Sequence, residues 1–178
     1  MRCFIAMPLP DELRDHLARA LTSGDKPSNI RRVAENRWHL TIAFLGEVDP
    51  KNIPKIIQKL KRNSWSPGTI TINKLETFPP LSPTLLVASG DAEPLRAWND
   101  FALLIKHEIS SLAPEIDEKP WMAHMTIGRA PRDMKLPTWQ KSIGPWTWRP
   151  EGFSLVYSNL NPEKAEGYKY LHDFHFKD

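Results

Sequence analysis

The pattern His-x-Thr-x, with apolar residues at both x positions, occurs twice in the chain, at His39–Ile42 and at His124–Ile127. Both copies lie in runs of strand-forming residues. Because side chains alternate along a strand, the histidine and threonine of each copy point to one face and the apolar residues point to the other. Each of these strands therefore needs a core on one side and presents a polar pair on the other. Two matched copies indicate that both polar pairs serve one site.

Each copy follows an apolar strand and an amphipathic helix, so the chain consists of two similar halves. In the first half, a strand at Arg2–Met7 precedes a helix that begins at Pro10. In the second half, a strand at Leu85–Ala88 precedes a helix with apolar positions from Leu95 to Leu112. The shared order of strand, helix and histidine strand predicts two related lobes.

The remaining segments are assigned from periodicity and turn residues. A helix is predicted to begin at Pro50, and residues 130–150, with four prolines and three tryptophans, are expected to form an irregular covering segment. The two histidine strands are expected at Trp38–Leu45 and Trp121–Ile127. Three further strands are expected at Thr69–Ile72, Phe153–Tyr157 and Tyr168–Phe176.

Composition limits the class of protein. A chain of 178 residues suits one domain or two small packed lobes. Its one cysteine, Cys3, lies in an apolar run and predicts a buried thiol in a reducing compartment. No apolar run approaches the ~18 residues that cross a bilayer, so we expect a cytoplasmic protein with no membrane partner. A formal charge of +3 permits a polyanionic partner without requiring one.

The doubled motif suits acid–base chemistry on a phosphate. Imidazole is the side chain that serves as neutral base or charged acid near pH 7, and displacement at phosphorus needs one of each. Threonine hydroxyls on the same face can donate to the non-bridging oxygens. The expected catalytic residues are His39 and His124, and the expected phosphate-binding residues are Thr41 and Thr126. No cofactor or metal is expected.

The sequence resembles the two-histidine (2H) phosphoesterases, and among them the RNA 2′,3′-cyclic phosphodiesterases, also called 2′-5′ RNA ligases. The resemblance covers nearly the whole chain and departs from the family at Ala123, where proline is common. Six segments carry it, in the family's order: Phe4–Ala6, Asn36–Val48, Phe78-Pro79, the strand and helix over Leu85–Ile109, His124–Arg129 and Gly167–Tyr170.

This resemblance implies a fold of the α/β (α+β) class over residues 1–178. A single 2H phosphoesterase domain would hold two lobes, with two antiparallel sheets related by pseudo-twofold symmetry around a central cleft and helices on the outside. It also implies hydrolysis of RNA 2′,3′-cyclic phosphate ends to a 2′-phosphomonoester, with His39 as proton donor and His124 as proton acceptor.

The resemblance further implies three nucleotide-binding residues. Phe44 and Arg129 would flank the terminal base, since an aromatic face and a guanidinium plane stack on any base. Tyr170 matches a tyrosine common near the family's end. The alternatives are core packing for Phe44 and Tyr170 and a solvated surface charge for Arg129. Three arginines before the first motif are candidates for the RNA backbone, the alternative being solvated loop charges: Arg31, Arg32 and Arg37.

Two alternative functions stay open at this stage: a non-catalytic nucleotide-binding module, and a 2′-5′ RNA ligase acting on tRNA halves. Intact histidines and threonines favour turnover over binding alone. The same acid and base serve both directions of the reaction, and bulk water favours hydrolysis. The expected partner is therefore RNA or an oligonucleotide with a 2′,3′-cyclic phosphate end, bound by a monomer.

Overall fold

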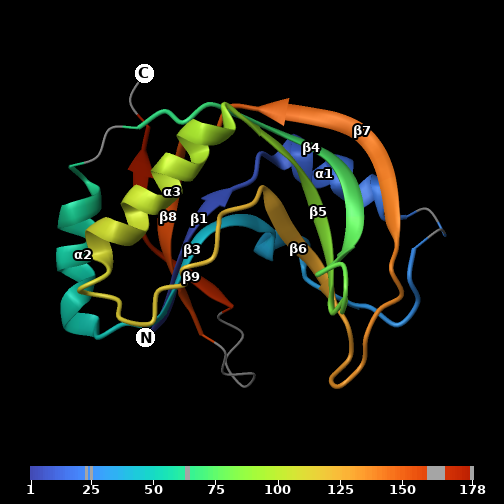
Figure 1. Cartoon of the computed structure of the whole chain (residues 1–178), viewed down its shortest axis with the longest axis horizontal. Coiled ribbons are helices and arrows are strands. Elements are labelled where there is room, and N and C mark those ends of the chain that lie inside the picture. The colour runs from blue at the N-terminus through green and yellow to red at the C-terminus, as the bar shows by residue number, and fades with distance from the viewer. Residues whose placement is uncertain (23, 25, 63–64, 160–166, 177–178) are drawn as a thin grey trace.

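The computed structural model describes residues 1–22, 24, 26–62, 65–159 and 167–176. These residues form two antiparallel sheets with three α-helices around them, which confirms the predicted fold class (Figure 1). Sheet A has the order β3 (His39–Glu47), β1 (Arg2–Pro8), β8 (Gly152–Ser158) and β9 (Tyr168–His175). The more strongly curled sheet B has the order β2 (Arg31–Arg32), β6 (His124–Arg129), β5 (Leu85–Glu93), β4 (Thr69–Phe78) and β7 (Gln140–Trp148).

The helices are α1 (Asp11–Ala20), α2 (Ile53–Leu60) and α3 (Leu95–Ile109), with 3₁₀ turns at Glu35–Arg37 and Pro50–Asn52. All three α-helices were predicted. The α3 helix ends at Ile109, three residues before the last apolar position of the predicted stripe. Its buried side chains recur every three or four residues, as an amphipathic helix requires: Trp98, Phe101, Ala102, Ile105 and Ile109.

The helices α1 and α3 each follow a strand of one sheet but pack against the other sheet. The α1 helix follows β1 of sheet A, yet His16 on it hydrogen-bonds the carbonyl of Gly144 in β7 at 2.8 Å. The α3 helix follows β5 of sheet B, yet the Phe101 ring lies 5.4 Å from the ring of Phe153 in β8. Figure 1 shows α1 behind the curled sheet and α3 against sheet A. Buried residues from both sheets and these helices form one apolar cluster.

Two sequence-based assignments were wrong. Residues 130–150 are not a wholly irregular cover, because β7 spans Gln140–Trp148 and pairs with β4. This strand holds Pro145, which a sheet tolerates at an edge where the missing N–H breaks no ladder bond. The second histidine strand also begins later than expected, at His124, and leaves Trp121 in the connection that follows α3.

Candidate active site

A cleft of about 1090 Å³ is lined by both His-x-Thr-x motifs. His39 and Thr41 reach it from β3 of sheet A, and His124 and Thr126 reach it from β6 of sheet B. The apolar partners of each motif are buried on the opposite faces, as strand alternation predicts. The structure thus brings the four expected residues to one cavity.

Each histidine uses the same nitrogen to bind the backbone. The Nδ1 of His39 lies 2.8 Å from the carbonyl oxygen of Arg37, and the Nδ1 of His124 lies 3.1 Å from that of Met122. A carbonyl only accepts, so both rings carry their proton on Nδ1 when neutral. Among the described residues, no hydrogen bond engages Nε2 of either ring. Both rings are therefore oriented to accept or donate a proton through Nε2.

The surroundings of the two imidazoles differ. The His39 ring stacks on Phe4 at 4.8 Å and meets the edge of Tyr168 at 5.3 Å. Burial lowers the pKa of His39, the Arg37 carbonyl opposes this by stabilising the charged ring, and the positive charge of Arg129 lowers the pKa further. His124 has one aromatic neighbour among the described residues, Phe78 at 5.7 Å. The pKa of His39 thus lies below the ordinary value for a histidine.

A β-bulge at the last residue of each motif turns a further side chain toward the cleft. In β3, Thr41 is opposite Ala6 and Ala43 is opposite Ile5, so Ile42 has no partner on β1. The extra residue reverses the alternation, which otherwise places residues five apart on opposite faces. Phe44, five residues after His39, consequently lines the cleft with 52% of its surface exposed.

The second motif has the same arrangement. Thr126 is opposite Val87 and Gly128 is opposite Leu86, so Ile127 has no partner on β5. Arg129, five residues after His124, lines the cleft as well. The two lobes therefore match in their histidine orientation and in a bulge at the fourth residue of the motif, and β3 has a second register shift at Leu45.

Comparisons with known proteins agree with this geometry. A family model described as "LigT like Phosphoesterase" matches residues 7–87. An RNA 2′,3′-cyclic phosphodiesterase of Thermus thermophilus is 29% identical over 181 residues, which cover 98% of this chain and 89% of the relative. A crystal structure of a Thermus thermophilus protein superimposes with a TM-score of 0.80 at 28% identity, over 99% of this chain and 98% of that one. The chain is thus similar to the LigT-like phosphoesterases in sequence over residues 7–87 and in fold over nearly its whole length. An RNA 2′,3′-cyclic phosphodiesterase of Archaeoglobus fulgidus is a further relative, 27% identical over 135 residues and 74% of each chain.

The connection from α3 to β6 holds the backbone of Phe44. Phe44 N–H donates to the Asp117 carboxylate at 3.1 Å, and Asp117 N–H donates to the Phe44 carbonyl at 2.9 Å. The same carboxylate oxygen lies 3.3 Å from the ammonium of Lys106, which is 9% exposed and also donates to the Lys119 carbonyl at 2.7 Å. A largely buried ion pair therefore fixes the strand segment that carries Phe44.

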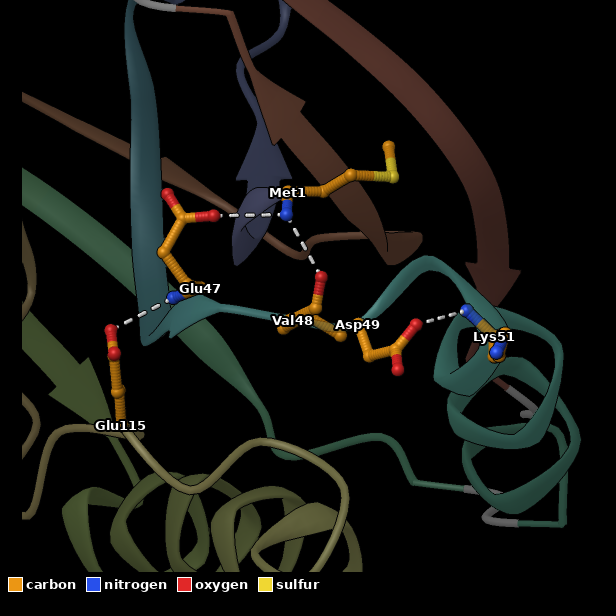
Figure 2. Close-up of polar contacts among 6 residues, drawn as sticks. All are labelled: Met1, Glu47, Val48, Asp49, Lys51 and Glu115. Carbon is orange, nitrogen blue, oxygen red and sulfur yellow. Dashed lines mark hydrogen bonds and ion pairs between the residues drawn. The ribbon is translucent and has the colours of Figure 1, made fainter.

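The same connection binds β3 at two more points. The indole N–H of Trp121 donates to the Thr41 carbonyl at 3.0 Å. At the far end of the strand, Glu115 accepts from Glu47 N–H at 2.9 Å, and the Glu47 carboxylate binds the Met1 amine at 2.9 Å (Figure 2). Gly46, which precedes Glu47 in β3, has a φ of +66°, and a Cβ on this residue would lie 2.4 Å from the side chain of Glu115. Both observations favour glycine at this position. Since the connection leads directly into His124, it links the two motifs mechanically.

The cleft differs from the sequence-based expectation at one tyrosine. Tyr168, not Tyr170, lines it and contacts His39. Tyr170 lies further along β9, is 48% exposed, and has a pKa raised by burial of its hydroxyl. Sequence reasoning also missed Phe4, whose contact with His39 depends on the pairing of β1 with β3.

The three arginines before the first motif all line the cleft. Arg31 and Arg32 form β2, which was expected to be part of a polar loop, and Arg37 lies 5.6 Å from the Tyr168 ring. Among the described residues, no group of three or more His, Cys, Asp and Glu side chains is placed to hold a metal ion. No helix in this part of the chain is both long and apolar enough for a membrane span.

Proposed function

We propose that this phosphoesterase hydrolyses 2′,3′-cyclic phosphate ends of RNA to 2′-phosphomonoesters, without a metal ion. The observation that carries the proposal is the matched orientation of His39 and His124, each with Nδ1 bound to a carbonyl and Nε2 left to exchange protons. Relatives named RNA 2′,3′-cyclic phosphodiesterase support the substrate.

The reaction needs one proton removed and one supplied. In the proposed mechanism, His124 takes a proton from water as its oxygen attacks phosphorus, and His39 gives a proton to O3′ as the P–O3′ bond breaks. The hydroxyls of Thr41 and Thr126 donate to the non-bridging oxygens and steady the charge that develops there. The products are a free 3′-hydroxyl and a 2′-phosphate.

The role of His39 as donor depends on the substrate. In the free protein its pKa is lowered, so it is mostly unprotonated at pH 7. An anionic cyclic phosphate beside the ring favours the charged imidazole and raises that pKa. A phosphate-loaded site would thus begin turnover with a protonated His39, and an empty site would not.

The terminal nucleoside is proposed to lie between Phe44 and Arg129. Both line the cleft on the histidine side of their strands because of the bulges at Ile42 and Ile127. An aromatic ring and a guanidinium plane stack on any of the four bases, so this arrangement favours no base strongly.

The test is hydrolysis of a cyclic-phosphate-ended oligonucleotide in excess EDTA, with the products resolved by phosphorus NMR. We expect undiminished turnover and a 2′-phosphate. Loss of activity on chelation, restored by one divalent metal, would refute the metal-independent mechanism. Predominant 3′-phosphate would refute the proposed seating of the ribose. Tight binding without turnover would instead support a binding module.

A further inference from the structure

Two arginines stand directly opposite one another at the rim of the cleft. In the pairing of β2 with β6, Arg31 is the cross-strand partner of Arg129, and both line the cleft. Like charges at such a position repel each other, because paired side chains have Cβ atoms only about 5 Å apart. Among the described residues, no carboxylate forms an ion pair with either one.

The guanidinium of Arg31 is oriented by one backbone contact. Its Nη2 donates to the Ala130 carbonyl at 3.2 Å, and its remaining N–H groups have no acceptor among the described residues. The neighbouring Arg32 differs, since its Nη2 donates to the Leu21 carbonyl beyond the end of α1, at 3.3 Å. Both arginines line the cleft, and Arg31 is the one that stands opposite Arg129, whereas Arg32 stands opposite Gly128.

The position of Arg31 separates it from the phosphate held by the histidines. His124 is opposite Ser89 and Arg129 is opposite Leu85, four residues away on β5, so at about 3.3 Å per residue Arg31 lies about 13 Å from His124 along the sheet. This places it beyond the reacting phosphate and beside the site proposed for the terminal base.

The charge of the whole cleft favours an anion at this end. Four arginines on or near the strands at this end line the cavity: Arg31, Arg32, Arg37 and Arg129. A fifth, Arg2, also lines it and is opposite Glu47 in the pairing of β1 with β3. The two glutamates that line it, Glu47 and Glu115, lie together at the other end of β3, where both are engaged in hydrogen bonds or an ion pair. A guanidinium fork matches phosphate oxygens in shape and charge.

We propose that Arg31, beside Arg129, binds the phosphodiester that joins the terminal nucleotide to the rest of the RNA, so that the preferred substrate is an oligonucleotide. This inference rests on the proposed function, because it needs the terminal nucleotide seated between Phe44 and Arg129.

The test measures kcat/KM for the wild type and for Arg31→Gln on three substrates. They are a nucleoside 2′,3′-cyclic phosphate, a dinucleotide with the same end, and that dinucleotide with an uncharged methylphosphonate linkage. We expect the wild type to prefer the charged linkage in kcat/KM and Arg31→Gln to lose about tenfold of that preference. The slope of log(kcat/KM) against log[salt] for the charged dinucleotide should fall by about 0.7, the value of one single-strand phosphate contact.

A matched control is Arg96→Gln, which removes one positive charge from the outer side of α3 and should keep the full preference. Thermal unfolding separates a binding role from a structural one, because relief of repulsion should leave the Tm of Arg31→Gln unchanged or higher. An equal fractional loss on all three substrates would overturn the proposal, as would a preference that follows the penultimate base instead of the charge of the linkage.

Calorimetric binding of the corresponding 2′-phosphate products keeps the two proposals distinguishable. Tighter binding of the charged dinucleotide product, without any turnover, would support the Arg31 site and reject hydrolysis. Turnover without discrimination between charged and uncharged linkages would support hydrolysis and reject the Arg31 site.

Discussion

Ile42 and Ile127 hold the same position in two different strands: each is the third residue after a motif histidine, and each lacks a partner on the neighbouring strand. Both are buried, so the bulge is anchored by the core on the side away from the cleft. This local geometry puts Phe44 and Arg129 on the same face as the histidines. The paired bulges thus make the residue five positions after each histidine available to a ligand.

Loss of either stacking group should weaken binding of the terminal nucleotide. We expect Phe44→Ala and Arg129→Ala each to raise KM by an amount equivalent to about 1 to 3 kcal/mol, with little change in base preference. Steady-state kinetics with the four nucleoside 2′,3′-cyclic phosphates measures this. The exposed side chains Leu103 and Arg96 on α3 provide matched alanine controls. A sharp change in base selectivity would indicate hydrogen-bond recognition instead.

Removal of either imidazole should affect turnover more than binding. We expect His39→Ala and His124→Ala to lower kcat by about 10² to 10⁴, the usual contribution of one acid or base. Product affinity, measured by calorimetry, should change far less. His107→Ala on the exposed side of α3 is the control. Wild-type kcat in either motif variant would contradict the two-histidine mechanism.

The charge of Arg129 should be detectable at His39. Because that charge lowers the pKa of His39, Arg129→Gln should raise it. Titration of the His39 imidazole proton signals by NMR measures the shift, and Arg96→Gln should leave the signals unmoved. Added 2′-nucleotide product should raise the same pKa in the wild type. A fall in the pKa of His39 on product binding would instead indicate that His39 is the proton acceptor and His124 the proton donor.

The lowered pKa of His39 also links stability to pH. The folded state binds this proton less readily than the unfolded chain, so the free energy of unfolding should rise with pH through the interval below the ordinary value of 6.5. The contribution is complete above 6.5 and is lost as the pH falls through the folded-state pKa. Urea titrations of His39→Asn should show a shallower dependence on pH across this interval. An unchanged slope would mean that other groups set it.

Asp117 should act on catalysis through Phe44. Asp117→Ala removes the acceptor for Phe44 N–H and leaves Lys106 without its carboxylate, so we expect a loss of about 1 to 3 kcal/mol in the free energy of unfolding together with a higher KM. Asp117→Asn can still accept from Phe44 N–H, so it should restore KM while remaining less stable. In a double-mutant cycle with Phe44→Ala, the two KM effects should not add. Full additivity would exclude the positioning role.

The doubled motif and the apolar periodicities allowed much of this arrangement to be predicted. Side-chain alternation reports which face of a strand is buried, so His39 and Thr41 could be assigned to one face without any coordinates. The orientation of Arg129 could not be obtained in this way, since regular alternation over five residues predicts the opposite face. The bulge that reverses it is visible only in the pairing with β5.

The remaining errors also concern long-range pairing. Pro145 made the segment around β7 look irregular, although an edge position in sheet B accommodates proline. Tyr168 and Tyr170 are equivalent by residue type and spacing, and the contact with His39 distinguishes them only in three dimensions. The sequence contains these residues but not the register that selects among them.

Because α1 covers sheet B and α3 covers sheet A, the two halves of the chain are interlocked, and neither half holds a complete core of its own. A fragment that ended between β4 and β5 would keep the first motif and lose the helix that shields its sheet. We therefore expect the halves to unfold together, with no stable half-molecule, and we expect little hinge motion between the imidazoles. The exchange of helices makes the spacing of the two catalytic groups a property of the whole chain.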